Sequence, residues 1–195
     1  MPDNDLSDDE IRRRMRRLMI LVHAMDCLST SLSVWLALRD NDTNGVTHSL
    51  TDSYTRPVTD TEAVRLQFHH DETTTYRTGA LWADLGGVPT RIATANSLIV
   101  TSRLSIGVLN DLKNGVSLGI ALQKVGVRRH TQPPVFATVP DGGGGTRLIA
   151  RITATLFVGG REWAVTDEEI DQVVVTHREP GPAALARASL QPTRL

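Results

Sequence analysis

The sequence contains a single cysteine, Cys27, among its 195 residues. A lone cysteine excludes an intramolecular disulfide, and it excludes the Cys-x-x-Cys pairs of structural zinc sites. No histidine stands in an evident catalytic relation to Cys27 along the chain, so the pattern does not indicate a thiol nucleophile. A reduced, unpaired thiol is typical of proteins in a reducing compartment.

The chain also lacks a charge bias and a long apolar run. Lys and Arg number 21 against 22 Asp and Glu, so the formal net charge is −1 at pH 7. A near-neutral total gives no global attraction to nucleic acid or to an anionic membrane surface. No apolar run approaches the roughly 18 residues of a membrane helix, and the N-terminus has no signal-peptide core. We therefore predict a soluble, cytoplasmic protein without a nucleic-acid or membrane partner.

Common motifs of catalysis and ligand binding are missing as well. The chain has no Gly-x-Ser-x-Gly nucleophile elbow, and no Lys-Ser/Thr follows the glycine run at 142–145, so this run does not form a phosphate loop. His69 and His70 are adjacent, and adjacent residues of a strand face opposite ways. They cannot easily share an ion, and we expect no metal site.

The N-terminal segment carries the signature of a helix. Ser7 and Glu10 have capping-box spacing, and acidic residues at 8–10 precede arginines at 12–14 in the order that favours helical ion pairs. Five arginines between residues 12 and 17 form either a phosphate-binding face or a solvated face laced with ion pairs. The neutral total charge favours the second interpretation.

The remaining pattern predicts an α+β fold, a mostly antiparallel sheet with helices inserted between strands. Alternation over 64–70 predicts a half-buried strand, and residues 73–84 and 89–100 predict an antiparallel pair. Helical spacing across 104–124, broken at Asn114-Gly115, predicts two short helices. Neither helix is basic enough to track the phosphates of DNA, which disfavours a DNA-binding helix-turn-helix.

The second strand of a predicted hairpin leads into three consecutive acids at 167–169, and the direction in which the first of them points bears on function. The turn Gly159-Gly160 joins two β-like runs, and counting outward from a two-residue loop places Asp167 opposite Ile152. Cross-strand partners share a face, and Ile152 belongs to the apolar face, so we predict that Asp167 points toward the core. A lone inward carboxylate has a raised pKa and is a functional candidate. The alternative is a strand that ends before Asp167 and leaves three consecutive acids in water.

An inward carboxylate needs a cation, and Arg77 is the candidate. Arg77 lies within a predicted strand, with Gly79 two residues on and on the same face. A glycine in that place lets a ligand or another chain approach closely. The alternative is an ordinary surface arginine.

Several segments, taken in order, resemble the chorismate lyase family, including its actinobacterial branch that makes 4-hydroxybenzoate. They are LSDDEIRRRMRRLMILV, YRTGALWADLGGVP, ANSLIVTSRLS, GVSLGIAL and GGREWAVTDEEI. The resemblance implies a single chorismate lyase-like domain over 6–177, with 1–5 and 178–195 as disordered tails. It also implies an antiparallel sheet whose inserted helices form flaps over an internal ligand cavity, the helices at 104–124 being one flap.

The resemblance further implies a set of site residues. Arg77 would hold a substrate carboxylate, helped by the backbone amides of Leu118, next to Gly119, and of Leu28. Asp167 would take the place of the acid near the ring hydroxyl, so that Arg77 and Asp167 carry the chemistry. The expected activity is the elimination of pyruvate from chorismate to give 4-hydroxybenzoate or a related aromatic acid, without metal or organic cofactor.

One departure from the family leaves alternatives open. Family members usually have glutamate where this chain is matched at Asp167, and a shorter acid displaces the carboxylate; a displacement of about 1 Å can cost on the order of 100-fold in rate. The chain is therefore a lyase, a variant lyase or cyclase acting on another small carboxylate in secondary metabolism, or a non-catalytic sensor of small carboxylates. Effector-binding domains of GntR-type repressors share the expected fold in outline. The pattern leaves base-assisted and concerted mechanisms open, and it indicates no oligomeric state.

Overall fold

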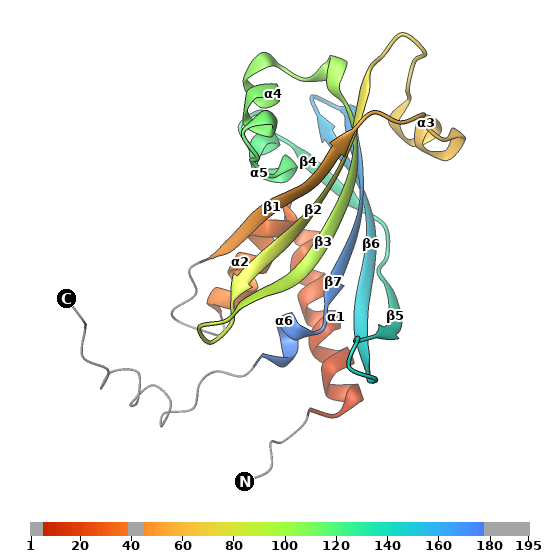
Figure 1. Cartoon of the computed structure of the whole chain (residues 1–195). Coiled ribbons are helices and arrows are strands. Elements are labelled where there is room, and N and C mark those ends of the chain that lie inside the picture. Colours follow the sequence, from red (N-terminus) through yellow and green to blue (C-terminus); the bar gives the residue numbers. More distant parts are fainter. Residues whose placement is uncertain (1–5, 39–44, 178–195) are drawn as a thin grey trace, which may run out of the picture.

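The computed structural model of the chain describes residues 6–38 and 45–177, so the predicted tails at 1–5 and 178–195 lie outside the described residues. Within these ranges the fold is α+β, as predicted, and it is built on one seven-stranded antiparallel sheet (Figure 1). The strand order is β1-β2-β3-β7-β6-β4, and β5 also pairs with β6. The strands are β1 Val46–Tyr54, β2 Thr74–Asp84, β3 Pro89–Val100, β4 Arg128–Thr131, β5 Val135–Pro140, β6 Thr146–Val158 and β7 Arg161–Asp171.

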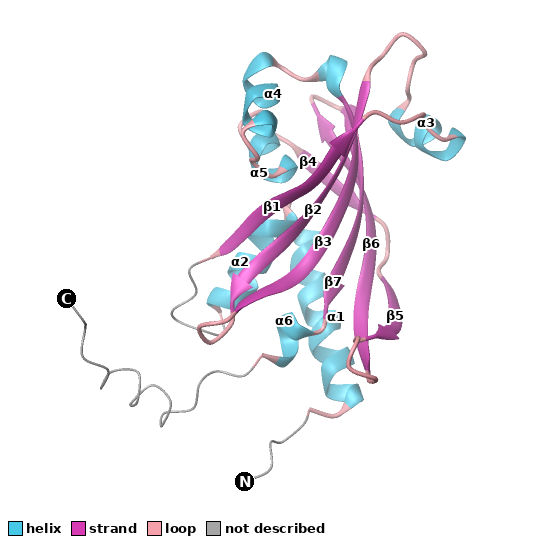
Figure 2. Cartoon of the chain, in the orientation of Figure 1, coloured by secondary structure: helices cyan, strands magenta, loops and turns pink. Residues whose placement is uncertain are grey.

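The helices divide between the two faces of the sheet. In the view of Figure 2, α1 and α2 lie behind the strands, and α4 and α5 form a separate unit beside the β1 end of the same face. Helix α3 lies at one end of the opposite face. No helix in the described part of the chain is long and apolar enough to cross a membrane. The helices are α1 Asp8–Ala24, α2 Leu28–Ala37, α3 Asp60–Leu66, the 3-10 turn Thr101–Arg103, α4 Ile106–Lys113, α5 Leu118–Gln123 and α6 Val173–Thr176.

Helix α1 begins where its cap predicts. The Ser7 hydroxyl accepts a hydrogen bond from the Glu10 amide at 3.3 Å, which satisfies one of the free donors of the first turn. Glu10 also pairs with Arg13 and, at 2.7 Å, with Arg14. The apolar stripe of the helix is buried against the sheet. Part of the arginine-rich face is therefore laced with ion pairs, as the neutral total charge suggested.

The segment predicted as a strand over 64–70 is instead the end of α3 and the loop after it. Thr59 and Glu62 form a complete capping box, a signal that the sequence carries but that the alternation over 64–70 obscured. Val64 is 78% exposed, whereas Leu66 is fully buried. The alternation therefore reflects one buried residue, Leu66, on a short helix. The residue after the helix, its C-cap Gln67, has a left-handed φ of 44°.

The hairpin at Gly159-Gly160 forms with the predicted two-residue turn, but a β-bulge changes its register. Val158 pairs with Arg161, and the register then shifts between Leu156 and Phe157. The extra residue is Trp163, which packs against the same apolar cluster as its neighbour Ala164. Consecutive residues that share a face are typical of a bulge, which reverses the faces of all residues beyond it.

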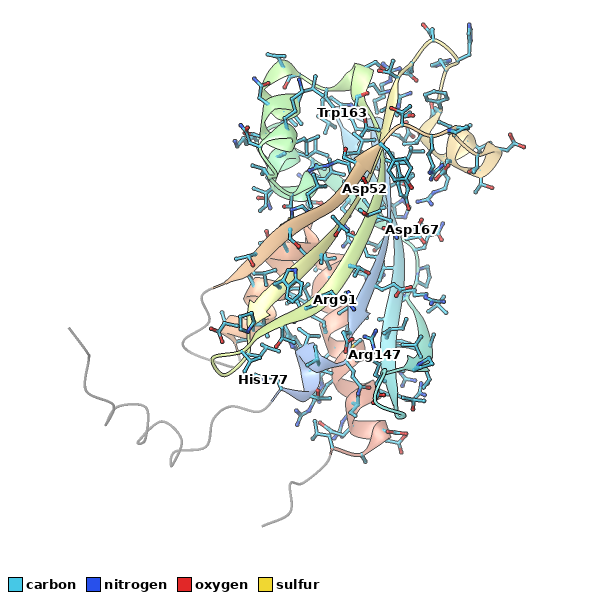
Figure 3. All side chains as sticks on the ribbon, in the orientation of Figure 1. Asp52, Arg91, Arg147, Trp163, Asp167 and His177 are labelled. Carbon is cyan, nitrogen blue, oxygen red and sulfur yellow. The ribbon has the colours of Figure 1, made fainter. Side chains whose placement is uncertain are left out.

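The prediction that Asp167 points inward is therefore wrong. Asp167 pairs with Thr153, and Ile152 pairs with Glu168. Asp167 is exposed on the outer face, where its carboxylate accepts a hydrogen bond from the Thr153 hydroxyl at 2.8 Å (Figure 3). Glu168 is only 5% exposed and points inward. The strand does continue through the acidic run, and the inward acid is a glutamate one position later than predicted.

Candidate small-molecule site

The candidate site is a pocket between the inner face of the sheet and the first turns of α2 and α5. The space between its walls amounts to about 610 Å³, a volume that includes the part open to solvent. The residues around it are Asp26, Cys27, Leu28, Ser29, His48, Leu50, Arg77, Thr78, Gly79, Leu81, Ala95, Ser97, Ser117, Leu118, Gly119, Arg129, Leu156, Thr166 and Glu168.

The floor of the pocket is made of small residues on the central strands. Cross-strand pairing aligns Gly79 of β2 with Ala95 of β3 and Glu168 of β7 in one row. The adjacent row of the same face contains Arg77, Ser97 and Thr166. Small side chains in the middle and long polar side chains at the ends leave space above the sheet, because residues in one row share a face. The register between β2, β3 and β7 is continuous across these two rows.

Arg77 supplies a buried positive charge to this pocket. Arg77 is 6% exposed. Its guanidinium donates a hydrogen bond of 3.1 Å to the main-chain carbonyl of Leu112, at the end of α4. Within residues 6–38 and 45–177 no carboxylate lies within ion-pair distance of Arg77. Desolvation lowers the pKa of Arg77 from its usual value, yet a guanidinium remains charged in proteins. Arg77 is thus a buried cation with donors left for an anion.

Glu168 and Arg129 form a second polar centre at the other side of the pocket. The Glu168 carboxylate pairs with Arg129, and their side chains are 6% and 1% exposed. Thr166 donates a further hydrogen bond to Glu168 at 3.0 Å, and Arg129 donates to the carbonyl of Val22 at 2.9 Å. Burial raises the pKa of Glu168, while Arg129 and Thr166 oppose the shift. The Nε of Arg129 is buried and has no partner among the described residues.

His48 of β1 reaches the pocket floor from the edge strand. A Cβ built on Gly79 would lie 2.6 Å from His48 Nε2, so the imidazole occupies the space that a side chain at 79 would need. The Nδ1 of His48 lies 3.2 Å from the carbonyl oxygen of Gly115, between α4 and α5. Burial is the main cause that lowers the pKa of His48; the contact with Gly115 opposes it and the charge of Arg77 adds to it.

Two helix N-termini complete the wall of the pocket. Leu28 and Leu118 are the first residues of α2 and α5, and amides of a first turn have no intrahelical acceptor. Gly119 lets α5 come close to α2, because a Cβ there would lie 2.6 Å from the sulfur of Cys27. Cys27 is buried, and its thiol contacts the Ser29 hydroxyl at 3.1 Å. The cysteine is thus part of the packing between the two helices.

The structure brings together four of the five residues named from the sequence. Arg77, Leu28, Leu118 and Gly119 all border the pocket, and Asp167 does not. Sequence reasoning missed Glu168, Arg129 and His48. The bulge that turns Glu168 inward has no local signal, and Arg129 arrives on a four-residue strand, β4, whose pairing with β6 is long-range. Gly79 was the sequence signal that could have pointed to His48. A glycine in a strand lets a ligand or another chain approach closely, and here the approaching group is the His48 ring.

The described side chains contain no group of three or more His, Cys, Asp or Glu that could hold a metal ion. The polar groups that border the pocket include Arg77, the Glu168–Arg129 pair and His48, together with the first main-chain amides of α2 and α5. This set suits recognition of an anion and the transfer or sharing of a proton at one carboxyl.

No protein-family model matches the chain, and no curated protein matches it by sequence. Among solved structures, the fold is similar to the ligand-binding domain of a protein assigned to the GntR family of transcriptional regulators from Bordetella bronchiseptica. The TM-score is 0.51 and the identity 12%, over 66% of this chain and 84% of that chain. This similarity establishes the fold alone.

Two further structures are similar over comparable lengths. A GntR-family transcriptional regulator from Enterococcus faecalis V583 has a TM-score of 0.45 and 14% identity, over 69% of this chain and 97% of that chain. A gene product from Staphylococcus aureus subsp. aureus N315 has a TM-score of 0.49 and 13% identity, over 75% of this chain and 88% of that chain.

Proposed function

We propose that this chain binds a small organic carboxylate in the pocket between the sheet and α5, with Arg77 as the main contact. The observation that carries the proposal is a buried guanidinium without a carboxylate partner in the described part of the chain. Burying a cation is costly unless it is paired. A ligand carboxylate would offset that cost, because carboxylates accept paired hydrogen bonds from a guanidinium.

The surroundings of Arg77 support an anionic ligand of modest size. The unpaired amides at the start of α2 and α5 can donate to the same or a second anionic group. Beside His48, which covers Gly79, the small residues Ala95 and Ser97 of β3 border the space that a ligand would occupy. One of the solved structures with a similar fold is a ligand-binding domain, which favours a binding role over catalysis for this pocket.

Calorimetric titration with a panel of acids tests the proposal. The panel contains benzoate, 4-hydroxybenzoate, chorismate and the methyl ester of benzoate, which has the same ring without a charge. We expect saturable binding of at least one acid and none of the ester. Arg77→Gln should weaken the binding about 10- to 150-fold, since a hydrogen bond to a charged group contributes about 1.5–3 kcal/mol.

Arg91→Gln is the matched control for this titration. Arg91 lies on β3, is exposed and does not border the pocket (Figure 3), so its loss should leave the affinity unchanged. Equal losses in the two variants would mean that the acids bind through general surface charge. Saturable binding of the ester would remove the carboxylate from the recognition.

A second candidate function is chorismate lyase activity, and Glu168 is the observation that favours it. Glu168 points into the pocket and its pKa is raised by burial. It is also the residue type that the family resemblance requires, and its position relieves the mismatch attributed to Asp167. In that reaction the ring loses a proton from carbon and becomes aromatic, the C–O bond to the enolpyruvyl group breaks, and the departing enolpyruvate takes up a proton at its methylene carbon to become pyruvate. Glu168 could accept the proton or bind the ring hydroxyl.

The lyase candidate is tested by incubating pure protein with chorismate, without added metal, and separating the products by chromatography. Formation of pyruvate and 4-hydroxybenzoate in equal amounts, reduced in Arg77→Gln, is the expected result for an enzyme. Binding of chorismate without product above the uncatalysed background would leave the carboxylate-binding function and reject the lyase.

A further inference from the structure

His48 is a polar residue of the pocket to which the carboxylate-binding function assigns no part. It comes from the edge strand β1, opposite Leu81 of β2, and its ring lies against the main chain of Gly79. Gly79 follows Arg77 by two residues on the same face of β2. His48 and Arg77 both border the pocket, and the charge of Arg77 acts on the imidazole of His48.

The hydrogen bond of Nδ1 fixes the tautomer of this histidine. A main-chain carbonyl oxygen is only an acceptor, so the Nδ1 that lies 3.2 Å from the Gly115 oxygen must carry the proton. Burial and the charge of Arg77 both lower the pKa of His48, which keeps the ring neutral. In a neutral imidazole with a proton on Nδ1, Nε2 is an acceptor. Among the described residues no donor is hydrogen-bonded to Nε2.

We propose that His48 is a specificity-determining residue, whose Nε2 accepts a hydrogen bond from a hydroxyl group of the molecule that Arg77 holds by its carboxylate. The proposal rests on the carboxylate-binding function and adds the class of ligand, a carboxylic acid that also carries a hydroxyl group. Arg77 selects the negative charge, and His48, which borders the same pocket, selects a hydrogen-bond donor on the same ligand.

A purely structural role for His48 is the competing explanation. The Nδ1–H group ties β1 to the junction between α4 and α5, near the Leu112 carbonyl that accepts from Arg77. The two roles use different ring nitrogens and can therefore be separated by substitution. Asparagine places its amide nitrogen near the position of Nδ1 and has nothing at Nε2, whereas glutamine places its amide group near Nε2.

The experiment measures the affinity ratio between a hydroxybenzoate and benzoate by calorimetry. Wild-type protein is titrated with benzoate and with 2-, 3- and 4-hydroxybenzoate, and the isomer that binds best sets the ratio. We expect this ratio to be about tenfold, because an unpaired acceptor in the pocket costs about 1.4 kcal/mol. His48→Asn should reduce the ratio to about one, and His48→Gln should preserve most of it. His130→Asn, an exposed histidine of β4 outside the pocket, should leave the ratio unchanged.

A second measurement does not depend on the choice of ligand. The nitrogen chemical shifts of His48, read from long-range 1H–15N spectra at neutral pH, should show a proton on Nδ1 and none on Nε2. A proton on Nε2 would overturn the proposal directly.

The binding outcomes distinguish the carboxylate site from the role of His48. If wild-type protein binds benzoate and the three hydroxybenzoates with equal affinity, the role of His48 is rejected and the carboxylate site is retained. A full ratio retained in His48→Asn has the same meaning, since the acceptor would then lie elsewhere. Failure of all four acids to bind overturns both the carboxylate site and the role of His48.

Discussion

The inner and outer faces of the sheet are built from alternate residues of the same strands. They differ in the exposure of two neighbouring acids, because Glu168 is buried on the inner face and Asp167 is exposed on the outer face. On the inner face Arg77, Arg129 and Glu168 are buried around a pocket. On the outer face Asp167 is exposed and bonded to the Thr153 hydroxyl. Asp167 and Glu168 are chemically similar neighbours in the chain. Their difference shows that the face of the sheet, set by a bulge several residues away, decides which acid is available for binding.

The largest expected effect comes from breaking the buried ion pair. Glu168→Gln leaves the Arg129 charge buried and unpaired, and such a loss costs about 3–5 kcal/mol. Asp167→Asn, on the exposed face, should change the free energy of unfolding by less than about 0.5 kcal/mol. Urea denaturation of the two variants measures both values.

A double variant shows whether the first effect belongs to the pair. Replacing both Glu168 and Arg129 by Met removes both charges, and replacing a buried pair by apolar residues is often neutral. The double variant should therefore recover much of the stability lost in Glu168→Gln. If Glu168→Gln and Asp167→Asn are equally mild, the two acids do not differ in the way that the two faces imply.

A smaller effect is expected from glycines on the two sides of the α4–α5 unit. Gly119 faces Cys27, and Gly119→Ala would force a Cβ to within 2.6 Å of the sulfur; overpacking of this kind costs about 1–3 kcal/mol. At Gly107 of α4 the only nearby atom is the Ser105 hydroxyl oxygen, at 4.0 Å. Gly107→Ala should therefore stabilise the protein by about 0.5–1 kcal/mol.

Thermal unfolding of the two alanine variants, with and without a bound acid, gives the comparison. Gly119→Ala should also weaken acid binding, because its helix start borders the pocket. If the two variants shift the melting temperature in the same direction, the close contact between α5 and α2 is not a constraint on the pocket.

The sequence allowed the fold and half of the site to be predicted, for physical reasons. Caps, alternation and turn glycines are local, and they identified α1, the β2–β3 pair and the two short helices α4 and α5. The expectation that Arg77 lies in a ligand site came from the family resemblance. Trp163 becomes a bulge only because it and Ala164 both pack on the α4–α5 cluster, which is a tertiary effect. The same holds for Arg129, whose short strand has its position only through pairing with β6. The prediction for Asp167 was wrong because the bulge at Trp163 could not be foreseen, and this bulge reverses the face of each later residue of β7.

The smallest expected effect concerns acid on the outer side, where Arg56 and the Thr59 cap hold the pKa of Glu62 at about 2. A carboxyl whose pKa is lowered on folding adds stability above its unfolded pKa of about 4.5, and that stability is lost as pH falls toward 2. The ion pair is partly solvated, so Glu62→Gln should cost about 1 kcal/mol or less at pH 7. Urea curves of wild type and variant should converge between about pH 4.5 and pH 2. A gap between wild type and Glu62→Gln that stayed constant down to pH 2 would show that the outer acid acts through packing rather than charge.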